Sequence, residues 1–266
     1  MNLEKTQPVF IRNTEQRGEK RMDDKIRLSP LGKDMGIYIS DRHTFGTDAV
    51  LLSRFASPRP SERAADLGTG CGIVPFLWCL SAPPKAIDAV EIQPDAAALV
   101  RRSVEHNRLG GFLRIFTADL RRLEEILPAS GYDLVTCNPP YRPENTGKKN
   151  MDEGRRVARH EEQCTLADAA AAAARLLRFG GRFCLCQRPE RLPDVMEALR
   201  RAGLEPKILR LCAQWPGKKP FLCLVSARKG GRPFLEVQPT LYIEDSSGQR
   251  TEEIRQIYGK YGEVPE

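Results

Sequence analysis

The glycines at 68, 70 and 72 are the sequence feature that most constrains the fold. Residues 64–67 before them have the apolar composition of a short strand, and residues 73–80 after them that of a helix. Glycines in a strand-to-helix turn let the backbone approach a ligand at the carboxyl edge of a parallel sheet. The pattern is G-x-G-x-G, and Ile73 stands where a dinucleotide-binding G-x-G-x-x-G motif has its third glycine. The turn therefore favours a nucleoside ligand and disfavours a nicotinamide dehydrogenase.

Three acids stand at the ends of successive predicted strands. Asp66 ends the strand before the glycines, Glu91 ends the strand at 86–91, and Asp119 follows the strand at 113–117. A carboxylate at the second strand tip can accept hydrogen bonds from both hydroxyls of a ribose. Asp119 is then positioned to face the exocyclic amine of an adenine, and Asp66 suits a cationic amino acid group better than a phosphate.

The predicted strand at 133–137 delivers the tetrapeptide Asn138-Pro139-Pro140-Tyr141 to the same edge. Two prolines cannot continue a sheet ladder, so the chain is stopped and stiffened at this point. The Asn138 amide oxygen and a neighbouring carbonyl can accept both N–H bonds of a planar NH2 group, and the Tyr141 ring can stack on its plane. A flipped adenine or a glutamine amide has this shape. The alternative is a proline-rich turn that closes a strand, with Tyr141 as a surface anchor.

Alternating strands and helices predict an α/β fold, with a doubly wound and mostly parallel sheet of seven strands. Two last strands, at 206–211 and 221–226, predict an antiparallel edge hairpin. We expect an N-terminal arm with a short strand and helix over residues 1–60, the main domain over 61–231, and a C-terminal extension over 232–266. The charged segment 142–163 is long for a loop inside a domain and is typical of a functional lid.

Composition narrows the class of protein. With 41% hydrophobic and 29% charged residues in 266, the chain resembles ordinary soluble proteins. It shows no signal region and no apolar run of membrane-spanning length, so we expect no membrane association and a cytoplasmic location. Eight cysteines without a C-x-x-C pair, together with three histidines, predict buried thiols in a reducing compartment and no metal site.

The net charge of +7 is local. Between residues 200 and 232, nine Lys or Arg accompany the single acid Glu205. Such a segment predicts a basic face for nucleic acid, including Arg200, Arg201, Lys218 and Lys219. The alternative is a solvated cationic surface without a partner.

Together, the run from Asp66 to Gly72, Glu91, Asp119 and the tetrapeptide at 138–141 resemble the motifs of class I S-adenosylmethionine-dependent methyltransferases that act on planar nitrogens. The segment 45–52 (Phe-Gly-Thr-Asp-Ala-Val-Leu-Leu), the stretch 159–161 and the short tail after Leu241 further resemble the bacterial tRNA(Val) (adenine-N6)-methyltransferases.

The resemblance implies S-adenosylmethionine as cofactor, tRNA as the partner, and methylation of an adenosine next to the anticodon. It places Asp66, Gly68 and Gly70 around the methionine end of the cofactor, Glu91 on the ribose, Asp119 near the adenine and Asp48 near the methionine part. Asn138, the Pro139 carbonyl and Tyr141 would hold the target base.

Other readings share these motifs. Protein glutamine methyltransferases of the release-factor type use the same tetrapeptide but carry a helical substrate domain before the core, where this chain has about sixty mostly polar residues. A ribosomal RNA adenine or guanine methyltransferase stays open, because the tetrapeptide does not fix the base. An RNA-binding module with a decayed pocket is disfavoured by the intact glycines, Glu91 and tetrapeptide.

Overall fold

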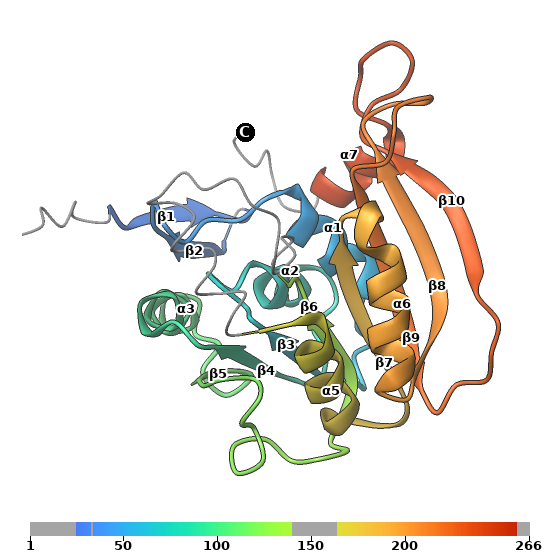
Figure 1. Ribbon diagram of the computed structural model, residues 1–266. Coiled ribbons are helices and arrows are strands. Elements are labelled where there is room, and N and C mark those ends of the chain that lie inside the picture. Colours follow the sequence, from blue (N-terminus) through green and yellow to red (C-terminus); the bar gives the residue numbers. More distant parts are fainter. Residues whose placement is uncertain (1–24, 33, 140–163, 260–266) are drawn as a thin grey trace, which may run out of the picture.

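An eight-stranded sheet runs through the computed structural model, which describes residues 25–32, 34–139 and 164–259 (Figure 1). The strand order is β10-β8-β9-β7-β6-β3-β4-β5. Of these strands β9 runs antiparallel to its neighbours β7 and β8, and the others run in one direction. The predicted doubly wound, mostly parallel sheet is confirmed. The strands are β3 (Arg63–Leu67), β4 (Ala86–Glu91), β5 (Leu113–Thr117), β6 (Tyr132–Cys137), β7 (Leu177–Gln187), β8 (Leu204–Ala213), β9 (Leu222–Lys229) and β10 (Glu236–Tyr242).

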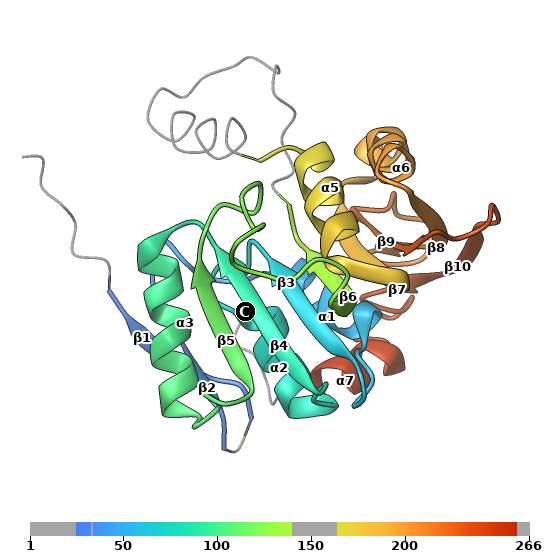
Figure 2. The same ribbon diagram turned by 90° about the horizontal axis from the view of Figure 1, so that it is seen from below.

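Helices cover both faces of the sheet (Figure 2). Buried residues of α1, α2, α3 and α7 form one core with one face, and those of α5 and α6 form a second core with the other. A doubly wound sheet buries both of its faces in this way. The sequences of its strands are therefore nearly continuous apolar runs. The helices of the described residues are α1 (Thr47–Ala56), α2 (Ile73–Ser81), α3 (Pro94–His106), α5 (Leu166–Leu176), α6 (Leu192–Arg201) and α7 (Glu252–Gly259), and a 3-10 turn lies at Pro189–Arg191.

The start of α5 follows its sequence signal. The Thr165 hydroxyl accepts from the Asp168 backbone N–H, and the Asp168 carboxylate accepts from the Thr165 backbone N–H, which completes a capping box. The helix ends at Leu176, and β7 begins at Leu177 and contains Gly180 and Gly181. A Cβ on Gly181 would lie 3.1 Å from the Tyr132 carbonyl oxygen, so glycine permits this close approach of two strands.

The C-terminal extension changes the edge of the sheet. β10 pairs in parallel with β8, so the predicted hairpin of β8 and β9 is flanked by a further strand and does not form the edge. α7 then returns to the sheet and buries Ile254 and Ile257. The sequence prediction of seven strands did not include β10, because Pro239 interrupts the apolar pattern of this segment. The register of β10 is irregular between Gln238 and Leu241, where that proline lies.

A small antiparallel pair precedes the main sheet. β1 (Arg27–Pro30) pairs with β2 (Gly36–Ile39), and α3 satisfies backbone donors of β2. The Gly36 N–H donates to Asn107 Oδ1 at 3.1 Å, and the Tyr38 N–H donates to Ser103 Oγ at 2.8 Å. These contacts dock the pair against the helix that follows β4. Across the described ranges, no helix has the length and apolarity needed to cross a membrane.

Candidate active site

The candidate site lies at the carboxyl edge of the sheet, where the chain order reverses. β3, β4 and β5 proceed outward in sequence, and β6 then returns to the other side of β3. The reversal between β3 and β6 is the topological switch point at which doubly wound sheets bind ligands. The glycine turn follows β3 and Asn138 follows β6, so these two sequence motifs flank that point directly.

The glycine turn is open on its ligand side. Gly68 has φ +67° and Gly70 has φ +57°, in the left-handed region that favours glycine. A Cβ built on either residue would have no described atom within 4 Å, whereas one on Gly72 would press on Phe76 and Val100 at 3.2 Å. The first two glycines therefore leave room for a ligand to approach the backbone, and the third allows α2 to pack closely.

Glu91 holds this turn in place. The carboxylate is buried, and its two oxygens accept from the backbone N–H of Gly70 at 2.8 Å and of Gln93 at 2.9 Å. A carboxylate has about four lone-pair directions, so two hydroxyl donors of a ribose can still be accepted. The geometry fits the role predicted for Glu91 and also gives the residue a structural one.

Asp66 is a buried carboxylate beside this turn. Its side chain accepts a hydrogen bond from Thr136 Oγ1 at 2.6 Å, across the register pair of β3 and β6. Burial raises the pKa of the Asp66 carboxyl to about 6, the hydrogen bond from Thr136 lowers it, and the charge of Glu91 raises it. A buried carboxylate is costly unless a positive charge accompanies it, so the site suits a ligand that brings such a charge.

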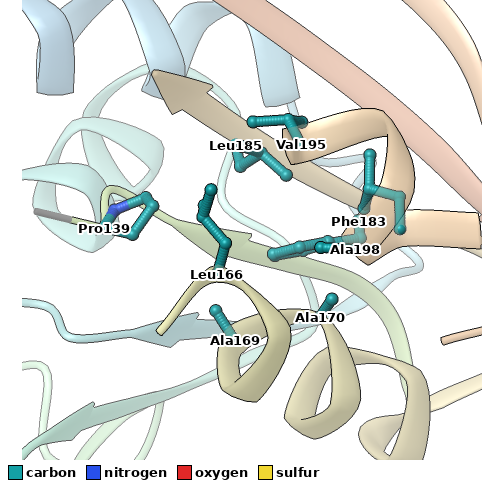
Figure 3. A pocket seen from close by; sticks show the side chains of 9 residues that line it. Pro139, Leu166, Ala169, Ala170, Phe183, Leu185, Val195 and Ala198 are labelled. Atoms are coloured by element: carbon teal, nitrogen blue, oxygen red, sulfur yellow. The ribbon is translucent and has the colours of Figure 1, made fainter. Parts of the chain in front are cut away.

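Asn138 and Pro139 follow β6 directly. The Pro139 ring lines a small apolar cavity of about 10 Å³ together with Leu166, Leu185 and Val195 (Figure 3). That volume holds at most about one water and contains no polar lining atoms. The cavity is therefore a packing gap, and apolar side chains of α5, α6 and β7 surround the Pro139 ring.

Asp48 reaches the same place from α1. It lies in the first turn of the helix, and its Oδ2 accepts from Asn138 Nδ2 at 3.4 Å. The prediction placed Asp48 near the methionine part of a cofactor. The structure brings it to the amide of the tetrapeptide.

Asp119 lies beyond the end of β5, which is tied to β4 by a hydrogen bond from the Ala118 N–H to the Glu91 carbonyl. Its carboxylate accepts from Arg121 Nε and Nη2, at 3.0 and 2.6 Å. This hydrogen bond lowers the pKa of Asp119. Any contact with an adenine amine would thus share the carboxylate with Arg121.

Two predictions fall outside the described residues, namely Tyr141 as a stacking platform and segment 142–163 as a lid.

Two residues near the site were not predicted from the sequence, Thr136 and Cys186. Thr136 had a signal, because it is a hydroxyl residue within an apolar strand. Cys186 had none, since its contact with Asn138 depends on β7 pairing with β6. Among the described residues, no three or more His, Cys, Asp or Glu side chains lie close enough together to bind a metal ion.

The four basic residues predicted to form one face are separated. Arg200 and Arg201 end α6 next to the start of β8, and Lys218 and Lys219 follow the end of β8. Ten residues of strand separate the two pairs, which is about 30 Å. Arg200 and Arg201 also pair with Glu205 and Glu197. Lys218 and Lys219 are exposed at the carboxyl edge, where Lys218 Nζ lies 4.9 Å from the centre of the exposed Trp215 ring.

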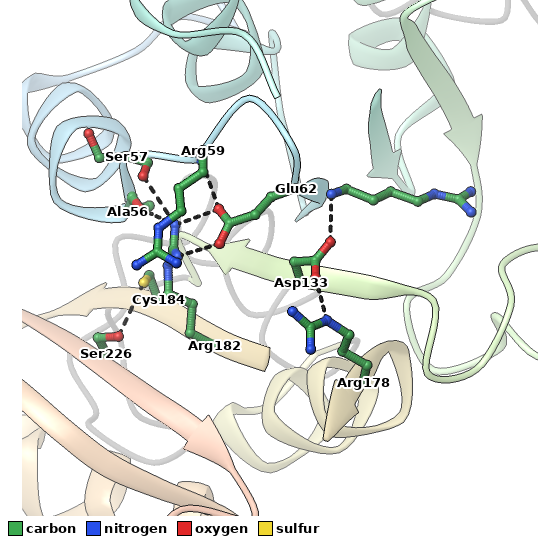
Figure 4. Close-up of polar contacts among 10 residues, drawn as sticks. Ala56, Ser57, Arg59, Glu62, Asp133, Arg178, Arg182, Cys184 and Ser226 are labelled. Carbon is green, nitrogen blue, oxygen red and sulfur yellow. Dashed lines mark hydrogen bonds and ion pairs between the residues drawn. The ribbon is translucent and has the colours of Figure 1, made fainter. Parts of the chain in front are cut away.

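A larger polar groove of about 800 Å³ lies elsewhere, at the amino ends of the strands between α1 and α7. Six of its charged side chains form ion pairs, namely Arg178 with Asp133 and Arg182 with Glu62 (Figure 4), and Arg210 with Glu253. Arg182 donates to both oxygens of Glu62 and to the Ala56 and Ser57 carbonyls at the end of α1. These bonds anchor α1 on the sheet, so this part of the groove has a structural role.

Comparison with known proteins agrees with this geometry. A curated tRNA1(Val) (adenine(37)-N6)-methyltransferase of Pedobacter heparinus is 28% identical over 59% of this chain, and the match spans 65% of that relative, slightly less than two thirds. A protein of the same name from Parabacteroides distasonis is 28% identical over 75% of this chain and 86% of its own length. The crystal structure of an Agrobacterium tumefaciens protein, described as a predicted O-methyltransferase, covers 81% of this chain and 97% of its own at a TM-score of 0.63 and 23% identity. The family described as methyltransferase small domain matches residues 30–199, well over half of the chain, and the chain therefore belongs to this family of methyltransferases.

Proposed function

We propose that this methyltransferase transfers a methyl group from S-adenosylmethionine to the exocyclic N6 amine of an adenosine in tRNA, at the position next to the anticodon in a tRNA(Val)-type substrate. The observation that carries the proposal is the placement of Asn138 and Pro139 beside the glycine turn at the switch point. The curated relatives with this activity in their names support the choice of base and of RNA. The reaction would take place in the cytoplasm.

The residues around the switch point fit S-adenosylmethionine. Gly68 and Gly70 leave open space beside the backbone, and Glu91 keeps lone pairs for ribose hydroxyls. Asp66 supplies the buried negative charge that the cofactor's ammonium group would neutralise. Asp119 would accept from the adenine amine together with Arg121.

The protein's part in the reaction is to bind, orient and desolvate. S-adenosylmethionine supplies an activated methyl group on sulfur, so the target amine must be aligned with it and kept from water. The Asn138 amide oxygen and the Pro139 carbonyl would accept the two N–H bonds of that amine. This draws the nitrogen lone pair out of conjugation with the ring, and the same acceptors stabilise the positive charge that develops on nitrogen. The amine would gain the methyl group with S-adenosylhomocysteine as the leaving group, and would give up one proton to water to become the neutral N6-methyl amine. Tyr141 would stack on the base.

The direct test is methyl transfer from labelled S-adenosylmethionine to separate pools of unmodified tRNA, ribosomal RNA and protein, followed by nucleoside and amino acid analysis. Label in N6-methyladenosine from tRNA is the expected result. Label in glutamine of a protein, or in ribosomal RNA, would overturn the proposed substrate while leaving the cofactor in place.

The raised pKa of Asp66 predicts a pH-dependent affinity for S-adenosylhomocysteine, which carries the same ammonium group. Below about pH 6 the free protein holds a proton on Asp66 that binding must release, because a nearby ammonium favours the carboxylate. Affinity should therefore rise between pH 5 and pH 7, by about tenfold, and level off above. Titration calorimetry across this range measures the effect.

The matched variant is Asp66→Asn, which keeps the side-chain shape without a titrating group. It should bind more weakly at pH 7 and lose the dependence between pH 5 and pH 7. A wild-type affinity that stays flat across this range would place the ammonium away from Asp66.

The separation of the basic residues predicts where RNA binds. The double variant Lys218→Glu/Lys219→Glu changes charge at the edge that holds Asn138 and should weaken tRNA binding. The plot of log affinity against log salt concentration should become shallower, with the magnitude of its slope smaller by about two, because each lysine is expected to neutralise one phosphate. Arg200→Glu/Arg201→Glu makes the same change of charge at the opposite end and should leave both quantities near the wild-type values. Equal effects of the two double variants would contradict a binding surface at the carboxyl edge.

A further inference from the structure

The Asn138 amide is held from two sides by residues far away in the sequence. Its Nδ2 donates to Asp48 Oδ2 at 3.4 Å, and its Oδ1 accepts from the Cys186 thiol at 3.1 Å. Asp48 is 90 positions away at the start of α1, and Cys186 is 48 positions away near the end of β7. Three separate elements thus meet at this one side chain.

The chemistry of the two partners decides which way the amide faces. A carboxylate can only accept hydrogen bonds, so the amide atom next to Asp48 must be nitrogen. Turning the amide by 180° would place Oδ1 against the carboxylate and face the NH2 group towards the thiol, a poor acceptor. The contacts therefore permit one orientation, with the oxygen on the side away from Asp48.

Asp48 is itself fixed. Its Oδ1 accepts from the Ala49 backbone N–H at 2.9 Å, in the first turn of α1. A negative side chain is favoured there by the exposed N–H groups of the helix terminus. One carboxylate oxygen is thus held by the helix, and the other is presented to Asn138.

We propose that Asp48 is a positioning residue that orients and polarises the Asn138 amide, with the Cys186 thiol as the second support. The inference rests on the proposed function, in which Asn138 Oδ1 accepts from the target amine. A carboxylate that accepts from Nδ2–H increases the electron density on Oδ1, and hydrogen bonds linked in this way strengthen one another. An amide oxygen can accept two hydrogen bonds, so acceptance from the thiol is compatible with acceptance from the substrate amine.

Asp48→Asn is the sharpest variant, because it preserves shape and removes one acceptor. The new side chain has a single oxygen, which can serve either the Ala49 N–H or Asn138 Nδ2, and its NH2 group meets a donor at the other position. Misplacing a substrate-orienting group costs on the order of 100-fold, so we expect kcat to fall by about 10- to 100-fold. The dissociation constant of S-adenosylhomocysteine should stay within about twofold of the wild-type value, since Asp48 acts here on the amide. Weakened cofactor binding with kcat unchanged at saturating cofactor would overturn the proposal and make Asp48 a cofactor ligand.

Variants of Cys186 test the second support independently, with Cys184 as a matched control. Cys186→Ala removes the donor and should lower kcat by about threefold, in line with one neutral hydrogen bond, and Cys186→Ser should restore it. Cys184 lies two residues earlier on the same strand, is equally buried, and its thiol donates to Ser226 at 3.5 Å. Cys184→Ala should therefore lower stability as Cys186→Ala does while leaving kcat unchanged. Equal kcat in the two alanine variants would remove Cys186 from the assembly.

A spectroscopic readout separates this inference from the proposed function. The side-chain NH2 resonances of Asn138, identified by their loss in Asn138→Ala, should show one proton shifted downfield by the carboxylate in the wild type. In Asp48→Asn that shift should disappear. A shift that persists would overturn the Asp48 contact, whereas a protein that shows the shift but methylates none of the three substrate pools would overturn the proposed function alone.

Discussion

Asn138→Ala is expected to abolish most methyl transfer while leaving cofactor binding intact. The variant removes the amide oxygen that accepts from the target amine and stabilises the charge that develops on it. Loss of one such group at a reacting centre costs about 10²- to 10³-fold in kcat. The measurement is single-turnover methyl transfer to tRNA at saturating S-adenosylmethionine, with the affinity for S-adenosylhomocysteine measured in parallel.

Asn138→Asp tests whether the amide group itself is needed, because it keeps the size of the side chain. It preserves the shape of the side chain but places a second carboxylate next to Asp48, and two adjacent carboxylates repel or share a proton. Transfer should therefore be slow in this variant as well. A wild-type rate in Asn138→Ala would remove Asn138 from the mechanism, and an equal loss of cofactor affinity would move it to the cofactor site.

Asp88→Ala is expected to destabilise the fold by about 2–4 kcal/mol, because it removes a buried carboxylate whose guanidinium partners are themselves only partly buried. Asp88 is fully buried in β4, towards the amino end of the sheet. It accepts from Arg63, from the Tyr132 hydroxyl at 2.6 Å and twice from Arg114. Without the carboxylate, the buried hydroxyl and the guanidinium of Arg63 lose their acceptor. Urea unfolding of the two proteins at pH 7 measures the difference.

The stabilisation that Asp88 provides should depend on pH. Burial alone would raise the pKa of Asp88, but the hydrogen bonds from Arg114, Tyr132 and Arg63 outweigh it and hold the pKa below its usual value. A lowered pKa contributes stability above the unfolded value, near 4, that is lost as the pH falls through the folded value. The difference between wild type and variant should shrink in that acidic range.

The matched control is Asp41→Ala. Asp41 pairs with Arg27 at 2.7 Å, but both side chains are about half exposed, at 62% and 49%. Exposed pairs contribute at most about 1 kcal/mol, so this variant should remain close to wild type. Similar losses in the two variants would show that the Asp88 cluster behaves like an ordinary surface pair.

The sequence predicted the elements whose signals are local. The glycines at 68–72, Glu91 and Asn138 each lie at a strand end, and strand ends in a parallel sheet share one edge, so their convergence followed from chain order. The start of α5 likewise depends on a local signal, the capping box formed by Thr165 and Asp168. β10 was not predicted as a strand, because Pro239 interrupts its apolar pattern and the strand is defined by its pairing with β8.

The sequence by itself determined the fold class, the edge at which the site lies and most of the residues proposed to line it, because strand, turn and cap signals act between neighbours. The tertiary structure alone decided that Asp48 meets Asn138 and that Cys186 supports it, since these contacts require α1 to pack on the sheet and β7 to pair with β6. It also decided that a basic segment continuous in sequence is split in space. A ten-residue strand carries the chain about 30 Å from one end of the sheet to the other, and only Lys218 and Lys219 reach the edge of the proposed chemistry.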